Sequence, residues 1–194
     1  PRGVRPLAFR VEARAGARSD GELRPLPLLP SRIRLAQSRF AAIKNRELGR
    51  PGHHTTVYPG VRELLDALAA RSDCVVGLLT GNVAQGARLK LGSAELDVAR
   101  FRVGAFGSDN IDRTELPAVA QRRAHEVLGV DLPGGDVVII GDTPADMRCG
   151  QGIGARAIGV ATAAYSVEQL LAAGAAAAFE DLSDTTAVLS AILQ

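Results

Sequence analysis

The 194-residue sequence lacks tryptophan and is poor in aromatic residues, which make up 4% of the chain. Leucine, valine, isoleucine and alanine must therefore fill the interior, and with 46% hydrophobic residues one sizeable core can be buried. Only two cysteines are present, Cys74 and Cys149, without CxxC spacing or a histidine partner. This pattern is typical of inert buried thiols in a reducing cytosol.

Long apolar segments are also absent. No run of roughly 18 apolar residues exists, which excludes a membrane-spanning helix. The start has neither an initiator methionine nor a continuous apolar region, so we expect no secretory signal and predict a cytoplasmic protein. The arginine- and proline-rich beginning favours an amino terminus that is truncated or mis-specified.

The net charge of +2 hides an asymmetry along the chain. Residues 1–50 hold twelve Lys and Arg against four Asp and Glu, whereas the remaining residues hold eleven against seventeen. A basic arm of this kind can bind nucleic acid. The arginines are scattered among Pro, Gly and Ala, without aromatic neighbours or a helical face, so we expect no nucleic-acid partner.

The sequence predicts three regions. Residues 1–30 contain five prolines and no helical period, which indicates an irregular lead. Residues 31–57 contain a helix from Ser31 to Gly49 and a linker with His53 and His54. Residues 58–194 alternate between strands and helices, which is typical of a doubly wound, mainly parallel α/β sheet. The expected strands are 74–79, 102–107, 136–141, 156–162 and 176–179, and the expected helices include 115–128, 144–149, 167–173 and 185–193.

Two of these strands end in distinctive polar residues. In GLLTGN, Thr80 follows the strand, and Gly81 and Asn82 form a tight turn before the next helix. A hydroxyl and backbone N–H groups at a helix N-terminus make an anion pocket, although Thr80 capping an ordinary turn is the simpler alternative.

In IIGDTPADM, Asp142 follows the strand and Asp146 lies one helical turn further on the same face. Two converging carboxylates repel each other without a cation, and Mg²⁺ is their natural partner. The alternative is that Asp142 caps the helix and Asp146 occupies its first turn.

Taken together, four segments resemble the haloacid-dehalogenase superfamily of Mg-dependent phosphohydrolases, and phosphoglycolate-phosphatase-like members most closely. They are YPGVRELLDAL, GLLTGN, FGSDNIDRTELPAVA and IIGDTPADMRCGQGIGARAIGVATA, in consecutive order. The resemblance covers roughly residues 55–182 and implies a Rossmann-like core with a truncated helical cap, of which residues 31–57 would be the remnant.

The resemblance also implies roles for individual residues. Thr80 matches the hydroxyl that hydrogen-bonds the transferring phosphoryl group, with Gly81 and Asn82 beside it. Asp142 and Asp146 match the acids that hold Mg²⁺. Arg113 matches the cation that neutralises the phosphoryl charge, with Lys90 as the alternative. The implied reaction is hydrolysis of a small phosphorylated metabolite through an aspartyl-phosphate, by a monomer or weak homodimer.

One family motif has no match in this sequence. The family begins with an apolar strand ending in Asp-x-Asp-Gly-Thr, whose first aspartate attacks phosphorus. LAFRVEA at 7–13 places Arg10 at the nucleophile and Glu12 at the acid, and the stretch around Asp20 places Arg18 there. Arginine cannot form a phospho-enzyme, so a second hypothesis is a non-catalytic remnant that binds phosphate or a partner.

The same departure has a structural consequence. In the family the first strand runs through the sheet centre, between the strands that end here at Thr80 and Gly141. Five missing buried apolar residues, at about 1.5–3 kcal/mol each, amount to much of a domain's stability. We therefore expect either another segment in this slot or an incomplete sheet.

Overall fold

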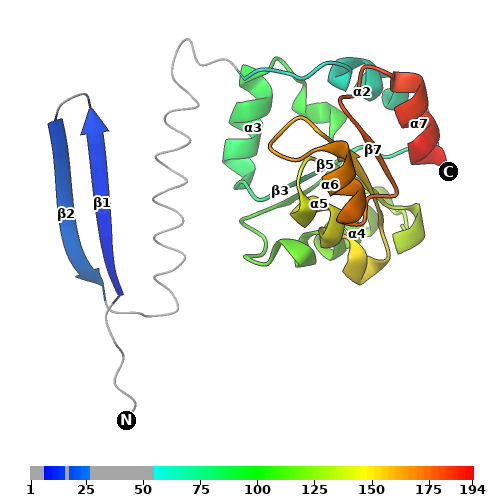
Figure 1. The fold of residues 1–194 in the computed structure, drawn as a ribbon. Coiled ribbons are helices and arrows are strands. Elements are labelled where there is room, and N and C mark those ends of the chain that lie inside the picture. The colour runs from blue at the N-terminus through cyan, green and yellow to red at the C-terminus, as the bar shows by residue number, and fades with distance from the viewer. Residues whose placement is uncertain (1–6, 16–17, 27–54) are drawn as a thin grey trace. The chain divides into compact units, whose positions relative to one another are not determined.

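A computed structural model describes the backbone of residues 7–15 and 18–26 and the whole of residues 55–194 (Figure 1). The chain divides into two compact units, Pro1–Arg46 and Glu47–Gln194, each of which is described by itself. The predicted helix at 31–48, the proposed cap remnant and the two linker histidines lie outside the described residues, apart from 55–57.

In the first unit, strands β1 (Leu7–Ala15) and β2 (Arg18–Leu26) pair as an antiparallel hairpin. The prediction of an irregular lead was therefore wrong over these residues. From Leu7 to Ala13 the sequence alternates between larger apolar residues and Ala, Arg or Glu, which is a strand period. The one proline inside the hairpin, Pro25, is tolerated because both strands of a two-stranded sheet are edges.

The second unit alternates strands with helices, as predicted. Its strands are β3 (Gly77–Thr80), β4 (Val103–Phe106), β5 (Val138–Gly141), β6 (Arg156–Val160) and β7 (Ala177–Phe179). Its α-helices are α2 (Val61–Ala69), α3 (Ala84–Ser93), α4 (Leu116–Leu128), α5 (Pro144–Cys149), α6 (Val167–Ala172) and α7 (Thr185–Leu193). Short 3₁₀ turns occur at Val98–Arg100, Arg113–Glu115, Gly134–Asp136 and Gln151–Ile153.

Element ends follow local backbone chemistry. Helix α4 ends where predicted, at Gly129, whose φ of 65° is a left-handed conformation that glycine adopts without strain. Helix α3 ends earlier than expected because Glu95 takes a φ of 55°, so the chain turns away before Leu96. Strand β5 begins two residues late because Gly134–Asp136 closes a 3₁₀ turn first.

The strands form two parallel sheets in the described part of this unit. β3 pairs with β4, whereas β5, β6 and β7 pair in that order. No ladder joins β3 to β5 among the described residues. The interruption falls where the family resemblance places its first strand, so the expected incomplete sheet is what the described chain contains.

Helices cover both faces of the three-stranded sheet, which confirms the doubly wound architecture. Along β6, Val160 packs in a cluster with Leu64 of α2 and Val188 of α7. Ala157 points to the opposite face and packs with Met147 of α5 and Leu170 of α6. This alternation follows from the two-residue period of a strand. Figure 1 shows α2 and α7 side by side, in agreement with their direct contact.

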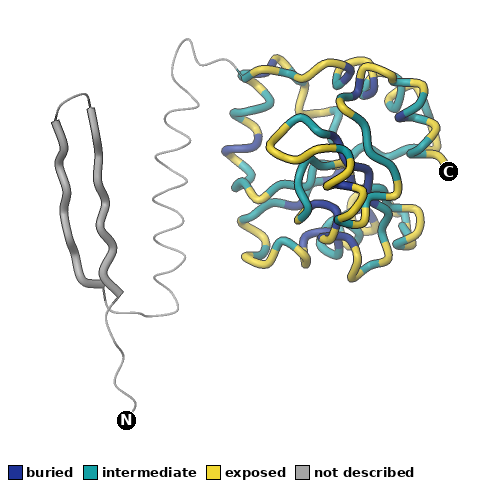
Figure 2. The backbone as a smooth tube through the Cα atoms, viewed as in Figure 1, coloured by how far each residue is buried: buried dark blue, intermediate teal, exposed yellow. Residues whose placement is uncertain are grey.

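Aliphatic residues fill this interior, as the lack of tryptophan predicts. The largest fully buried side chains are Leu116, Ile158, Leu170, Val188, Pro117 and Cys149. Figure 2 shows that the buried stretches run through the middle of the core unit, while its loops and outer helical faces are exposed. No helix in the described part of the chain is long and apolar enough to cross a membrane.

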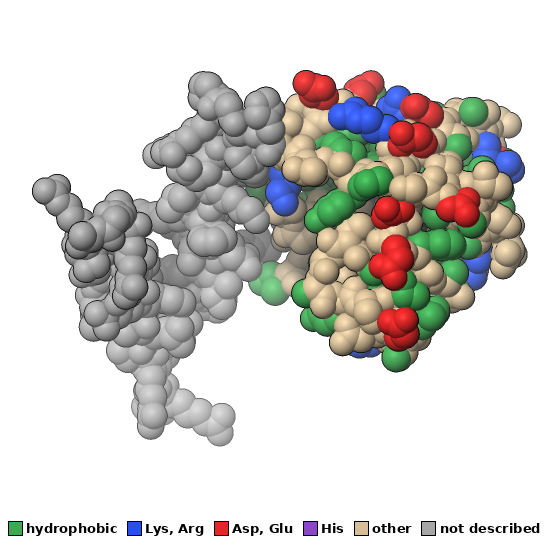
Figure 3. All heavy atoms as spheres, turned by 45° about the horizontal axis from the view of Figure 1, so that its top comes forward, with side chains coloured by type: hydrophobic (Ala, Val, Ile, Leu, Met, Phe, Trp, Pro, Cys, Tyr) green, Lys and Arg blue, Asp and Glu red, His purple; other side chains and the backbone are tan. Residues whose placement is uncertain are grey.

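The surface of the core unit mixes charged and apolar side chains. Figure 3 shows acidic side chains scattered over one face, with hydrophobic side chains between them. Several large hydrophobic side chains are exposed singly, among them Ile111 at 71% and Val127 at 67%. Scattered apolar residues of this kind are ordinary on a protein surface.

Candidate active site at the carboxyl ends of the strands

The turn after β3 is organised by the hydroxyl of Thr80. Its Oγ1 accepts hydrogen bonds from the backbone N–H of Asn82 at 3.1 Å and from the side-chain amide of Asn82 at 2.9 Å. The hydroxyl proton of Thr80 remains available to donate. Helix α3 then begins after Val83, which supplies no side-chain cap. This arrangement fits an anion pocket better than a capped turn.

The loop after β4 packs directly on this turn. The backbone N–H of Gly107 donates to the carbonyl of Asn82 at 2.9 Å. A Cβ at Gly107 would lie 2.0 Å from the carbonyl oxygen of Gly81, so only glycine allows this approach. The carboxyl ends of β3 and β4 are therefore held together by their backbones.

The shape of the β4 loop depends on two aspartates. Asp109 accepts from the backbone of Phe106 at 2.9 Å and binds both terminal nitrogens of Arg123 at 2.7 and 2.8 Å. Arg123 is the main reason that the pKa of Asp109 is lowered. Asp112 caps the next 3₁₀ turn by accepting from Thr114, which lowers the pKa of Asp112. Arg113 stands at the start of this fixed turn.

Arg113 reaches the helix that follows β5. Its Nη2 donates to Oδ1 of Asp146, whose side chain is only 5% exposed, while the arginine side chain is 41% exposed. The Nε of Arg113 is buried and has no hydrogen-bond partner in the described structure. Lys90, the alternative cation, forms no hydrogen bond or ion pair through its side chain with the described residues. Arg113 is thus the cation that contacts the predicted acids.

The second oxygen of Asp146 closes a capping box. It accepts from the Thr143 backbone at 3.1 Å and from the Thr143 hydroxyl at 2.7 Å, and the Thr143 hydroxyl caps the Asp146 N–H in return. Thr143, and not Asp142, is therefore the N-cap residue, so the alternative of Asp142 as a cap was wrong. Its other half was right, since Asp146 does lie in the first turn.

Gly141 explains how close Asp146 comes to the strand. A Cβ on Gly141 would lie 2.3 Å from the Cβ of Asp146, so the aspartate rests on the last residue of β5. Asp142 follows at once, and its carboxylate makes no hydrogen bond or ion pair with the described residues. Asp142 is the carboxylate at this strand end that is free to bind a ligand.

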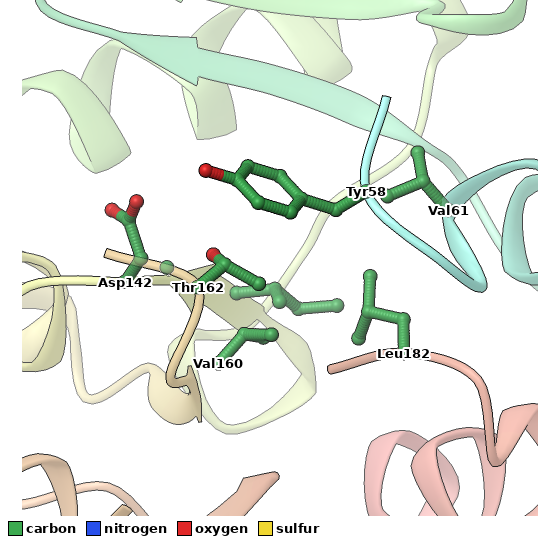
Figure 4. A pocket seen from close by; sticks show the side chains of 8 residues that line it. Tyr58, Val61, Asp142, Val160, Thr162 and Leu182 are labelled. Carbon is green, nitrogen blue, oxygen red and sulfur yellow. The ribbon is translucent and has the colours of Figure 1, made fainter. Parts of the chain in front are cut away.

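A cavity of about 250 Å³ opens beside Asp142. Figure 4 shows the Asp142 carboxylate and the hydroxyls of Tyr58 and Thr162 towards one end, and Val61 and Leu182 towards the other. One end is therefore polar and the other apolar. Thr80 does not line this cavity. A cleft shared by Thr80 and the two aspartates stays a prediction.

Two residues of this region were not predicted from the sequence. Thr143 could have been found, because Thr-x-x-Asp before a helix is the signature of a capping box. Tyr58 had no signal, because its place depends on long-range contacts: the backbone N–H of Leu182 donates to the carbonyl of Pro59 at 3.3 Å. As expected, His125 lies on the helix surface, 65% exposed and 2.8 Å from Asp131.

The other residues that the sequence singled out carry no site in the described chain. Cys149 is buried and donates to the carbonyl of Asp146, and burial raises the pKa of its thiol. Cys74 is partly buried and free. The candidates at the missing first motif lie on the hairpin strands, of which only the backbone is described; they are Arg10, Glu12, Arg18 and Asp20.

Comparison with known proteins agrees with this geometry. The family model described as HAD-hydrolase-like matches residues 116–185, a range that includes Asp142 and Asp146 but not Thr80 or Arg113. No curated protein matches the sequence significantly.

Solved structures give the wider agreement. A putative beta-phosphoglucomutase from Thermotoga maritima is 24% identical with a TM-score of 0.56, over 68% of this chain and 59% of its own. A predicted phosphoglycolate phosphatase from Haemophilus somnus is 17% identical with a TM-score of 0.62, over 84% and 69%. A hydrolase from Pseudomonas syringae is 24% identical with a TM-score of 0.56, over 68% and 58%.

The core has the haloacid-dehalogenase-like fold. The predicted resemblance to this superfamily, including its phosphoglycolate-phosphatase-like members, is confirmed. The chain spans less than two thirds of the length of two of these relatives, at 59% and 58%.

Proposed function

We propose that the core is the phosphate-handling part of a haloacid-dehalogenase-type phosphohydrolase for a small phosphorylated metabolite. The observation that carries the proposal is the convergence of Arg113, Asp146 and the free Asp142 carboxylate at one sheet edge. Ligands of doubly wound sheets bind at this edge, beyond the carboxyl ends of the strands. A guanidinium beside two carboxylates provides both signs of charge that a metal-bound phosphate needs.

The donor set fits Mg²⁺ when phosphate is present. All candidate ligands are oxygens, and Mg²⁺ in such sites takes one or two carboxylates plus substrate phosphate oxygens. Asp142 would be the first ligand, and Asp146 the second once it releases Arg113. No group of three or more acids, histidines or cysteines that could hold a metal occurs in the described residues. The ion, when bound, neutralises phosphoryl charge.

The chain's own residues would then orient the phosphoryl group. The Thr80 hydroxyl donates its free proton to a phosphoryl oxygen, with the N-terminus of α3 behind it. Arg113 offers Nε and Nη groups in a fork that matches phosphate geometry, although arginine cannot shuttle a proton. Gly81 and Asn82 keep Thr80 in place.

The covalent step needs a carboxylate that these residues do not provide. Asp142 and Asp146 are placed to hold the metal, and no other carboxylate contacts them in the described chain. A second candidate function, non-catalytic phosphate binding, is favoured by the ion pair that already neutralises Asp146. Both candidates share phosphate binding and differ only in turnover.

Two measurements on the full chain test these candidates. Calorimetry should show that Mg²⁺ binds at least about tenfold more tightly with inorganic phosphate present, and by thermodynamic linkage phosphate should gain equally from Mg²⁺. Asp142→Asn should abolish this coupling, whereas the same change at exposed Asp131 should leave it intact. Equal affinities with and without phosphate would refute the site.

Turnover decides between the candidates. We expect negligible hydrolysis of p-nitrophenyl phosphate or phosphoglycolate with Mg²⁺, because the attacking carboxylate is missing from the described core. If the parent hydrolyses either substrate and Asp142→Asn does not, a nucleophile lies elsewhere in the chain and the non-catalytic candidate is lost.

A further inference from the structure

The strands beside the sheet interruption have the composition of interior strands. β3 reads GLLT and β5 reads VIIG, without a charged residue or proline in either. Each pairs on one edge only within the described chain. Protein edges are normally protected by charges, prolines or bulges, because unpaired N–H and C=O groups attract further strands. These two edges lack all three devices.

Their side chains are also less buried than an interior strand requires. Parallel strands of this fold class are normally buried on both faces. Ile140 is instead 38% exposed, on the face that carries α2 and α7, and it lines the open cavity. All four residues of β3 are exposed or only partly buried. A further strand beside β5 would cover Ile140 and extend over the apolar wall formed with Val160.

Contacts at the carboxyl ends place both edges around one gap. The β3 turn is fixed to the β4 loop through Gly81 and Gly107, and the same loop sends Arg113 to Asp146 on the end of β5. Figure 4 shows β3 crossing above the cavity and the ring of Tyr58 below it, with the β5 end beneath. The β3–β4 and β5–β6 ladders are both parallel.

We propose that this gap binds an extended segment of a partner protein, with about four apolar residues followed by an acidic residue. The length follows from β3 and β5, which have four residues each. The acidic end follows from Arg113, whose buried Nε lacks an acceptor at the carboxyl ends of the strands within the described structure. A parallel strand brings its own carboxyl end to that nitrogen. The proposal does not depend on hydrolytic activity.

The test uses a synthetic peptide, acetyl-Lys-Lys-Gly-Val-Ile-Val-Val-Asp-amide, and the full chain. Binding is followed by calorimetry, and its place by hydrogen exchange of backbone amides. One control peptide has N-methyl groups on alternate apolar residues, which removes strand donors. A second ends in Asn instead of Asp. Protein variants are Ile140→Lys, which puts a charge on the edge, and Val127→Lys, at a 67% exposed helix position, as its matched control.

The expected result is protection of amides in both β3 and β5, and no new protection in β4 or β7. N-methylation and Ile140→Lys should each weaken binding at least about tenfold, whereas Val127→Lys should not change it. The Asn peptide should bind about tenfold more weakly than the Asp peptide to the parent, and equally to Arg113→Gln, with folding of each variant checked by circular dichroism.

Other outcomes overturn the proposal. Failure of the peptide to bind the folded monomer up to millimolar concentration removes the strand-acceptor site. Protection limited to β4 or β7 assigns the peptide to an ordinary edge. Strong protection of β3 and β5 before peptide is added shows that the chain fills its own gap, and protection that grows with protein concentration assigns the gap to a second copy.

Discussion

The ion pair between Arg113 and Asp146 allows a quantitative prediction about stability. Asp146 is 4% exposed and the only buried charged residue among those described, so its charge depends on Arg113 and Thr143. Removing one partner of a fully buried pair costs about 3–5 kcal/mol. Arg113 is 41% exposed and water can partly replace it, so we expect a coupling of about 1–2 kcal/mol.

A double-mutant cycle measures this coupling. Arg113→Met, Asp146→Asn and the double variant are compared by urea denaturation, since Met keeps much of the arginine stem and Asn keeps an acceptor for Thr143. The pair Arg100–Asp66, with side chains 35% and 65% exposed, is the matched surface control and should couple by less than about 0.5 kcal/mol. If both cycles give the same small value, Arg113 does not hold Asp146 in solution and the site geometry is wrong.

Three further predictions concern the same region. Thr143→Ala should destabilise the core by about 1 kcal/mol in thermal or urea unfolding, because it removes the N-cap of α5, whereas Thr143→Ser should be nearly neutral. Gly141→Ala should displace Asp146 and lower phosphate affinity measured by calorimetry, because the new Cβ has no room. Asp109 has a lowered pKa through Arg123, so its contribution is present above about pH 4 and is lost as the pH falls through the folded-state pKa. In acid titrations followed by circular dichroism, Arg123→Gln should flatten this loss, and an unchanged acid transition would contradict the assignment.

The elements that could be predicted from the sequence are those whose patterns are local. The unbroken apolar run before Asp142 predicted β5, and Gly129 predicted the end of α4, because strand burial and left-handed glycine are both visible within a few residues. The hairpin at 7–26 was missed because prolines at its margins outweighed the alternation between Leu7 and Ala13. A two-stranded sheet tolerates proline where a larger sheet would not.

Site residues divide in the same way. Arg113 was placed through the family resemblance, and the structure shows what it contacts, which no local pattern could show. That Asp142 and Asp146 differ in environment was also hidden from the sequence. One carboxylate rests on Gly141 and is held by two partners, whereas its neighbour four residues earlier has none among the described residues. The difference arises because Thr143 and not Asp142 starts the helix.

The sheet interruption links stability to function in this core. The carboxyl ends of β4 and β5 are joined across it by Arg113 and Asp146, a contact between charged side chains in place of a strand ladder. If a strand enters the gap, backbone hydrogen bonds take over that joining role and Arg113 gains a second acceptor. Asp146 is then less dependent on Arg113 and can turn to a metal-bound phosphate. Strand binding and phosphate binding should therefore reinforce each other, since each favours the arrangement in which the ion pair is loosened.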